Sequence, residues 1–184
     1  MPAILPDRLT AFAGAILSAS GSNERETRIV ADHLVEANLK GHDSHGIGMI
    51  PLYIDDRKAG ILKTNGKLSI VSDNGPMIVA DGDQSSGQVM AHEATELGIA
   101  RAKRDGLALV ALRNTHHMGR IGTYGEMTAA QGLSSLHFVN VTGHPPLVAA
   151  FGGYQARYAT NPVCISIPAA GGRLVIILDF ATSQ

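Results

Sequence analysis

The stretch Arg113–Tyr124 constrains this chain more than any other part of the sequence. It contains two adjacent histidines, His116 and His117, together with two arginines and two glycines. An apolar run at 107–112 precedes it and a helix-like stretch at 126–131 follows, so the pattern predicts a strand, a turn and a helix. Polar residues where the strands of an α/β sheet end often carry chemistry, and imidazole titrates near neutral pH. The turn therefore predicts an acid/base group, although a structural role is the common alternative for a histidine in a turn.

The composition indicates a globular protein with one domain, or one domain and a small extra piece. The chain has 184 residues, of which 45% are hydrophobic, and a net charge of −1. Mixed charges without a basic run argue against a nucleic-acid partner. The single cysteine, Cys164, excludes an intrachain disulfide and a cysteine-rich zinc site. Without a signal peptide or a long apolar run, we expect a cytoplasmic protein with no membrane partner.

The first part of the chain has helical periodicity. Apolar residues recur at helical spacing in the first predicted helix, with Leu9, Phe12 and Leu17 on one face. Asn23 and Glu26 match a capping box at the start of the second. The predicted helices span 7–20, 23–40 and 47–60, with a polar turn at 41–46 between the last two. We expect residues 1–62 to form a helical N-terminal subdomain.

The remainder alternates between strand and helix patterns. A hairpin is predicted over 67–81, because two period-two runs flank a turn of Asp, Asn and Gly. Further strands are expected at 107–112, 133–141, 163–168 and 174–178, helices at 88–104 and up to Gln131, and a hairpin turn at Gly171-Gly172. The predicted fold class is α/β (α+β), with a mixed sheet and flanking helices over 63–184. An apparently buried strand just before Gln184 leads us to expect an N-terminal fragment with a truncated sheet domain.

Two clusters of polar residues are candidates for chemistry. Ser44 and His45 follow Asp43 and suit a hydroxyl–imidazole relay, but these are also ordinary turn residues. His116 and His117 precede Arg120, whose guanidinium can hold a carboxylate by two parallel hydrogen bonds. That combination suits a 2-hydroxy or 2-oxo acid; the alternative is a surface arginine and a stacked histidine.

The remaining candidates also carry alternatives. Thr160-Asn161-Pro162 reads as a capped turn, and Asp179 either orients a histidine, contacts a ligand or caps the next helix. No Rossmann glycine fingerprint, P-loop or His-Glu-x-x-His motif is present. We predict no metal, but His42, His45 and one of His116 or His117 leave a metal-dependent hydrolase as an alternative.

Five motifs, taken in order, resemble a known family. They are Gly41-His-Asp-Ser-His-Gly46, His116-His-Met-Gly-Arg-Ile-Gly-Thr-Tyr124, Phe151-Gly-Gly153, Thr160-Asn-Pro162 and Leu178-Asp-Phe-Ala-Thr-Ser183. This order is similar to that of the malate/L-sulfolactate/L-lactate dehydrogenase family, and most similar to its bacterial hydroxycarboxylate dehydrogenase B branch. The resemblance covers essentially the whole chain.

The resemblance implies a homodimeric oxidoreductase that uses NAD or NADP on a dinucleotide-binding fold other than Rossmann. It implies that His117 is the acid/base residue, that Ser44 and His45 form a relay, and that Asp179 belongs to the catalytic site. Residues expected at the dinucleotide by resemblance are Asp179, Phe180, Ala181, Thr160, Asn161, Pro162, Val141 and Thr142. The expected reaction is hydride transfer between NAD(P)H and the C2 carbon of a 2-oxo or 2-hydroxy acid.

Two departures from the family pattern modify that expectation. Met49 stands where several relatives carry an arginine that binds the substrate carboxylate. We therefore predict that Arg120, with His116, takes that role, and that Met49 favours a bulkier or aromatic 2-oxo acid. Family enzymes are roughly twice as long, so a truncated fragment without activity is a further alternative.

Overall fold

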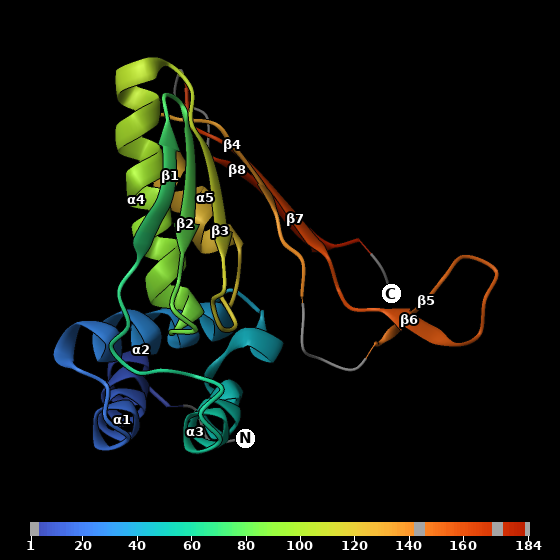
Figure 1. Ribbon diagram of the computed structural model, residues 1–184. Coiled ribbons are helices and arrows are strands. Elements are labelled where there is room, and N and C mark those ends of the chain that lie inside the picture. The colour runs from blue at the N-terminus through green and yellow to red at the C-terminus, as the bar shows by residue number, and fades with distance from the viewer. Residues whose placement is uncertain (1–3, 142–145, 171–174, 183–184) are drawn as a thin grey trace. The chain divides into compact units, whose positions relative to one another are not determined.

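The computed structural model describes residues 4–141, 146–170 and 175–182, and it divides into two compact units (Figure 1). The N-terminal unit ends at Arg120 and the C-terminal unit begins at Ile121. The domain boundary near residue 62, inferred from periodicity, remains a prediction. Within the described residues, no helix has the length and hydropathy needed to cross a membrane.

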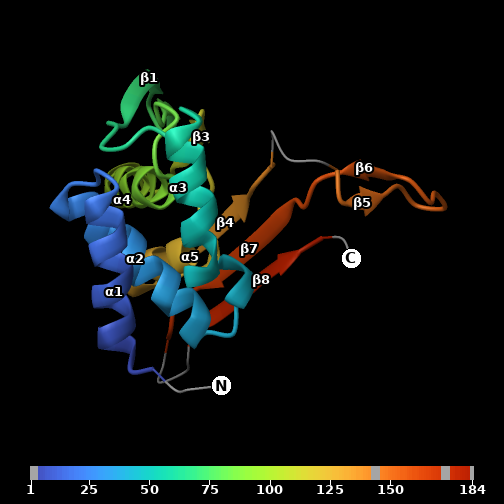
Figure 2. The same ribbon diagram turned by 90° about the horizontal axis from the view of Figure 1, so that it is seen from below.

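The first residues of the N-terminal unit are helical, as predicted (Figure 2). Helix α1 spans Pro6–Ala19, α2 spans Glu24–Leu39, the 3-10 helices η1 and η2 span Asp43–His45 and Ile47–Met49, and α3 spans Ile50–Lys58. The Asn23 side chain accepts from the backbone N–H of Glu26 at 2.9 Å, which confirms half of the capping box. Glu26 does not complete the box. Its carboxylate is buried and accepts from Arg57 at 3.0 Å and from the Asn65 N–H at 2.8 Å.

The core of the N-terminal unit lies between these helices and the sheet that follows. Ala13 and Leu17, one helical turn apart, form the buried stripe of α1, so Phe12 points aside and is 62% exposed. Its predicted place on the core face was therefore wrong. The largest fully buried apolar side chains of this core are Leu17, Val30, Leu34, Tyr53 and Met90.

A three-stranded sheet completes the N-terminal unit. Strands β1 (Ser69–Asn74) and β2 (Met77–Asp81) form the predicted antiparallel hairpin. Helix α4 (Gly87–Asp105) then leads to β3 (Leu109–Arg113), which pairs parallel to β2. A parallel pair joined by a helix places both strand ends at one edge, and the segments after β2 and β3 start there.

The described residues of the C-terminal unit form one helix and five short strands. Helix α5 spans Gly122–Ala130, β4 spans Ser135–Phe138, β5 and β6 span Val148–Ala149 and Ala156–Tyr158, β7 spans Pro162–Ile167, and β8 spans Ile176–Ala181. The sheet order is β4-β7-β8, entirely antiparallel, and β5 pairs with β6 as an unpredicted hairpin. Strand β4 is shorter than predicted. The glycine turn at 171–172 and Thr142 lie outside the described residues.

Helix α5 starts earlier than the sequence pattern indicated, because an acidic side chain stabilises its first turn. The Asp179 carboxylate accepts from the Gly122 N–H at 2.7 Å. A carboxylate at a helix N-terminus satisfies a backbone N–H and interacts favourably with the helix dipole. The helix that Asp179 caps precedes it in the chain.

The last strand is not buried, contrary to prediction. Ile176, Leu178 and Phe180 alternate along β8 and are 59%, 49% and 43% exposed. They share one face of the sheet with Leu136 and Phe138 of β4, through the pairing of both strands with β7. The opposite face of the sheet packs against α5, which buries Cys164 and Ser166.

Candidate active site

The turn that follows β3 carries both adjacent histidines, and the start of α4 holds its backbone. The His116 N–H donates to the Ser85 carbonyl at 2.9 Å. A Cβ added to Gly87 would lie 2.2 Å from the His116 carbonyl oxygen and 2.4 Å from that of His117. Only a glycine permits this approach, so the turn and the first residues of α4 fix one another.

His117 is held by a buried tyrosine. The Tyr53 hydroxyl lies 2.7 Å from Nδ1 of His117, and the Gln88 amide donates to that hydroxyl, also at 2.7 Å. Tyr53 is 2% exposed, and this burial raises the pKa of its hydroxyl well above the usual value, so the group stays protonated. Ser86 in turn donates to the Gln88 side-chain oxygen at 3.1 Å. With Nδ1 committed to Tyr53, proton exchange between His117 and a substrate would use Nε2.

The predicted pair Ser44 and His45 lies beside His117. The Ser44 hydroxyl is 2.9 Å from Nδ1 of His45, as the relay requires. The His45 ring stacks on the His117 ring, with centroids 5.3 Å apart and planes at 27°. The structure therefore brings Ser44 and His45 close to His117, which follows them by more than 70 positions in the sequence.

His116 has an acidic partner. Its Nε2 lies 2.8 Å from the Asp56 carboxylate, and both side chains are mostly buried, at 12% and 18% exposure. The ring also meets Tyr53 edge to face, with centroids 5.6 Å apart. Asp56 thus contacts the same ring nitrogen that His116 would need for its predicted role in substrate binding. The periodicity of the sequence did not reveal this partner.

Arg120 and Met49 are both near the interior of the N-terminal unit. Arg120 is 6% exposed, and its backbone N–H donates to Nε2 of the buried His33 at 2.9 Å. Met49 is partly buried against the apolar core. A carboxylate bound by Arg120 must therefore be enclosed by protein.

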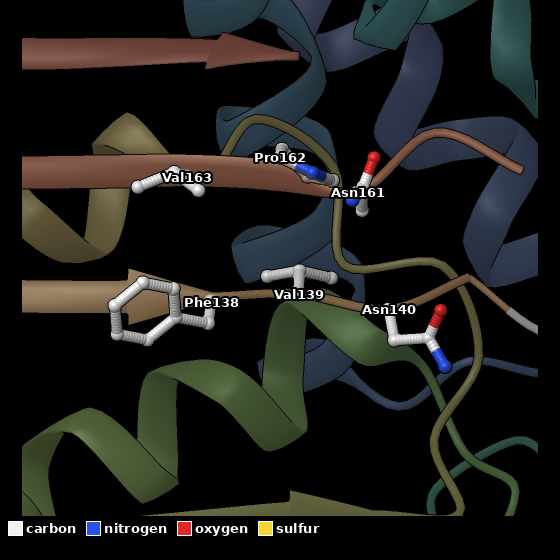
Figure 3. A pocket seen from close by; sticks show the side chains of 6 residues that line it. All are labelled: Phe138, Val139, Asn140, Asn161, Pro162 and Val163. Atoms are coloured by element: carbon white, nitrogen blue, oxygen red, sulfur yellow. The ribbon is translucent and has the colours of Figure 1, made fainter. Parts of the chain in front are cut away.

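The other predicted residues belong to the C-terminal unit. A pocket of about 240 Å³ is lined by Phe138, Val139, Asn140, Asn161, Pro162 and Val163 (Figure 3). A second hollow of about 380 Å³ shares Asn140 and Asn161 and adds Thr182, whose hydroxyl donates to the Asn161 side chain at 2.6 Å. The structure brings Asn161 and Pro162 into one pocket, while Thr160, Val141, Phe180 and Ala181 do not line it.

One further histidine in this unit is electrostatically perturbed. Nε2 of His137, on β4, lies 2.9 Å from the Ser135 hydroxyl, and the two groups share a hydrogen bond. Burial lowers the pKa of His137, and the negative charge of Asp179 acts in the opposite direction. Asp179 thus faces both a helix start and a histidine.

Among the residues that the structure describes, no group of three or more histidine, cysteine, aspartate or glutamate side chains could hold a metal ion.

Sequence reasoning missed four residues of this arrangement: Tyr53, Asp56, Gln88 and His33. A signal was available for two of them. Tyr53 and Asp56 are three positions apart on a predicted helix and so share one of its faces, next to a polar turn. Nothing in the sequence indicated that this face meets a turn that follows more than 60 residues later.

Comparison with known proteins places the chain in a family. The family model described as malate/L-lactate dehydrogenase matches residues 4–184. The chain belongs to this family. It is 48% identical over 175 residues to hydroxycarboxylate dehydrogenase B of Escherichia coli, covering 95% of this chain and 48% of that protein. It is 41% identical over 154 residues to L-lactate dehydrogenase of Cupriavidus necator, covering 84% and 44%.

The fold agrees with this assignment. The solved structure of malate dehydrogenase from Pyrococcus horikoshii matches with a TM-score of 0.90 and 33% identity, over 97% of this chain and 50% of that one. The expected membership and the α/β fold class are confirmed. The chain spans about half the length of the curated relatives it matches.

Proposed function

We propose that this chain carries the acid/base residues of an NAD(P)-dependent dehydrogenase that acts on 2-hydroxy and 2-oxo acids. The observation that carries the proposal is the 2.7 Å contact between Nδ1 of His117 and the buried Tyr53 hydroxyl, which fixes the ring for proton exchange at Nε2. Relatives named L-lactate, malate and L-sulfolactate dehydrogenase support the substrate class, since each name denotes a 2-hydroxy acid.

In the proposed reaction, His117 moves one proton. During reduction, Nε2 gives a proton to the carbonyl oxygen at C2 as a hydride reaches the carbon; during oxidation, Nε2 removes that proton from the hydroxyl. The Tyr53 hydroxyl both accepts and donates, so it can hold Nδ1 whichever charge the ring carries. Proton transfer by a positioned group typically contributes about 10²–10⁴-fold to the rate.

We propose that Ser44 and His45 relay protons between solvent and His117. Ser44 is exposed, His45 is partly buried, and the stacking of His45 on His117 shields one face of the acid/base ring. The 2.9 Å contact between the Ser44 hydroxyl and Nδ1 of His45 holds the second ring in place.

The pocket of the C-terminal unit has a suitable donor set for a dinucleotide. Asn140 and Asn161 offer amide donors and acceptors, and Phe138, Pro162 and Val163 offer apolar surface for a planar ring. When bound there, the nicotinamide would supply the hydride. We propose that Asp179 supports this region by capping α5, because the Gly122 N–H already occupies one of its carboxylate oxygens. Phe180, Ala181, Thr160, Val141 and Thr142 stay predicted cofactor residues.

We propose that Arg120 binds the substrate carboxylate and that Met49 lines the space beside it. Replacing Arg120 by Met should raise the KM for the 2-oxo acid far more than the KM for the nucleotide. Equal KM values in the variant and the wild type would contradict the assignment. A panel of pyruvate and bulkier or aromatic 2-oxo acids tests whether Met49 favours the larger substrates.

The decisive variant is His117→Ala. We expect it to lower 2-oxo acid reduction by the whole protein by about 100-fold or more, since the proton donor is lost. His92→Ala, on α4 and paired with Glu96, is the matched control and should retain full activity. If His117→Ala keeps most of the activity, the proposed function is wrong.

Nucleotide binding is tested separately. Titration of this chain with NADH and with NADPH, followed by nucleotide fluorescence, should show saturable binding if these residues build most of the cofactor site. The preferred nucleotide follows from the two dissociation constants. Light scattering of the same sample tests the homodimer expected from the family resemblance.

A further inference from the structure

One face of α3 contacts two consecutive residues of the reactive turn. Tyr53 and Asp56 lie three positions apart on this helix, so their side chains project from the same face. Tyr53 contacts Nδ1 of His117 at 2.7 Å, and Asp56 contacts Nε2 of His116 at 2.8 Å. The two histidines therefore share a single support.

The contact with Asp56 involves a mostly buried carboxylate and a mostly buried imidazole. Their side chains are 18% and 12% exposed, and the His116 ring packs edge to face on Tyr53. A charge-assisted hydrogen bond is stronger than a neutral one and is screened less when its groups are removed from solvent. Asp56 thus restrains His116 and, through its ring, the tyrosine that orients His117.

The backbone of the turn adds a second restraint. The start of α4 holds it through the hydrogen bond from His116 to the Ser85 carbonyl and through the close approach of Gly87. The main chain is thereby fixed by α4, while the side chains of His116 and His117 are fixed by α3. A rotation of the His116 ring would have to displace either Asp56 or Tyr53.

We propose that Asp56 and His116 form a positioning pair for His117, rather than His116 binding the substrate. The inference rests on the proposed function for its kinetic consequence, but the pair itself is a feature of the N-terminal unit. Misplacing a reacting group by a small distance can lower a rate by up to about 10²-fold, so a loss of the pair should appear in kcat.

The kinetic test uses Asp56→Ala, Asp56→Asn, His116→Ala and the double variant Asp56→Ala/His116→Ala. We expect Asp56→Ala to lower kcat about tenfold and to change the KM of the 2-oxo acid less than about twofold. Asp56→Asn should recover most of kcat, because the amide oxygen still accepts from His116. The double variant should lose no more than either single variant, since the two residues act as a unit.

Asp55→Ala is the matched control. Asp55 precedes Asp56 on α3, its side chain is 75% exposed, and its carboxylate lies 3.7 Å from Nζ of Lys58. It should leave kcat and KM unchanged. If Asp56→Ala matches this control in kcat, or if the loss in His116→Ala lies only in KM for the 2-oxo acid, the positioning pair is overturned and His116 is a substrate-binding residue.

A spectroscopic test does not depend on activity. With histidine labelled in the imidazole nitrogens, NMR of the chain should show changed ring signals for both His116 and His117 in Asp56→Ala, and for neither in Asp55→Ala. Unmoved His117 signals would overturn the proposal. If Asp56→Ala does not fold, His116→Ala serves instead: changed His117 ring signals are then expected, and unmoved ones would likewise overturn the proposal. A wild-type protein that reduces no 2-oxo acid would refute the proposed function, while these signals would still decide the pair.

Discussion

The two units of this chain differ in how their residues are buried. The N-terminal unit encloses large apolar side chains such as Leu34 and Met90, and it also buries polar groups such as Glu26 and His33 with partners. In the described part of the C-terminal unit, the buried residues are mostly small, as Cys164 shows, and large apolar side chains lie exposed along the sheet.

The difference shows which part of the proposed chemistry has firm support. The proposed acid/base residue, His117, is hydrogen-bonded to Tyr53, a side chain at 2% exposure in a packed core, and this contact fixes the orientation of the imidazole ring. Four of the predicted cofactor residues, Pro162, Asp179, Phe180 and Ala181, lie on β7 and β8, in a sheet whose β4 residues Leu136 and Phe138 are 63% and 76% exposed. Large exposed apolar surfaces of this kind usually mark a contact site.

The largest difference in stability is expected when two glycines with nearly the same φ angle, one in each unit, are replaced by alanine. Gly119 in the N-terminal unit has φ of 72°, and an added Cβ would lie 2.2 Å from Nε2 of the buried His33. Gly152 in the C-terminal unit has φ of 73°, and an added Cβ would meet nothing within 4 Å. We expect Gly119→Ala to lower the free energy of unfolding by about 4 kcal/mol and Gly152→Ala by about 1 kcal/mol. Urea denaturation measures the free energy of unfolding of both variants. Equal losses would contradict the described difference between the interiors of the two units.

The next comparison uses two leucines. Leu34 of α2 is fully buried, whereas Leu136 of β4 is 63% exposed. Leu34→Ala should lower the free energy of unfolding by about 3 kcal/mol, because apolar burial is lost and a cavity remains. Leu136→Ala should lower it by less than about 1 kcal/mol. Hydrogen exchange of amides in each unit reports the two losses separately. A cost for Leu136→Ala as large as that for Leu34→Ala would mean that the sheet face is covered in solution.

The smallest effect concerns pH. Because burial lowers the pKa of His137 in the folded state, the unfolded chain binds the proton more readily. The contribution of His137 to stability is therefore complete above its unfolded pKa of about 6.5 and is lost as pH falls through the folded value. His137→Gln should reduce the fall in unfolding free energy between about pH 7 and pH 5. An unchanged pH slope in this variant would show that His137 is not the group responsible.

Much of the local structure could be read from the sequence. Helical spacing predicted α1, α2 and α3, and the Asp73-Asn74-Gly75 turn predicted the β1–β2 hairpin. The order of motifs was enough to expect the family that the comparisons confirm. These features depend on neighbours in the chain, so a single sequence contains their signal.

The errors share a different cause. Phe12 has helical spacing but lies outside the buried stripe, and β8 reads as apolar but is exposed on alternate residues. Burial depends on what packs against a face, and periodicity only says that a face exists. Likewise, α5 begins at Gly122 because Asp179, 57 positions later in the chain, caps it.

The sequence by itself determined most of the elements and the family, and through the family resemblance the histidine expected to carry the proton. Only the tertiary structure decided what surrounds that histidine: His45 on its ring, Tyr53 on Nδ1, and Asp56 on its neighbour His116. The physical reason is the distance along the sequence over which each interaction acts. Helix and turn preferences act within a few residues, whereas a hydrogen bond between residues 53 and 117 forms only after α3 and the turn have been brought together by the core.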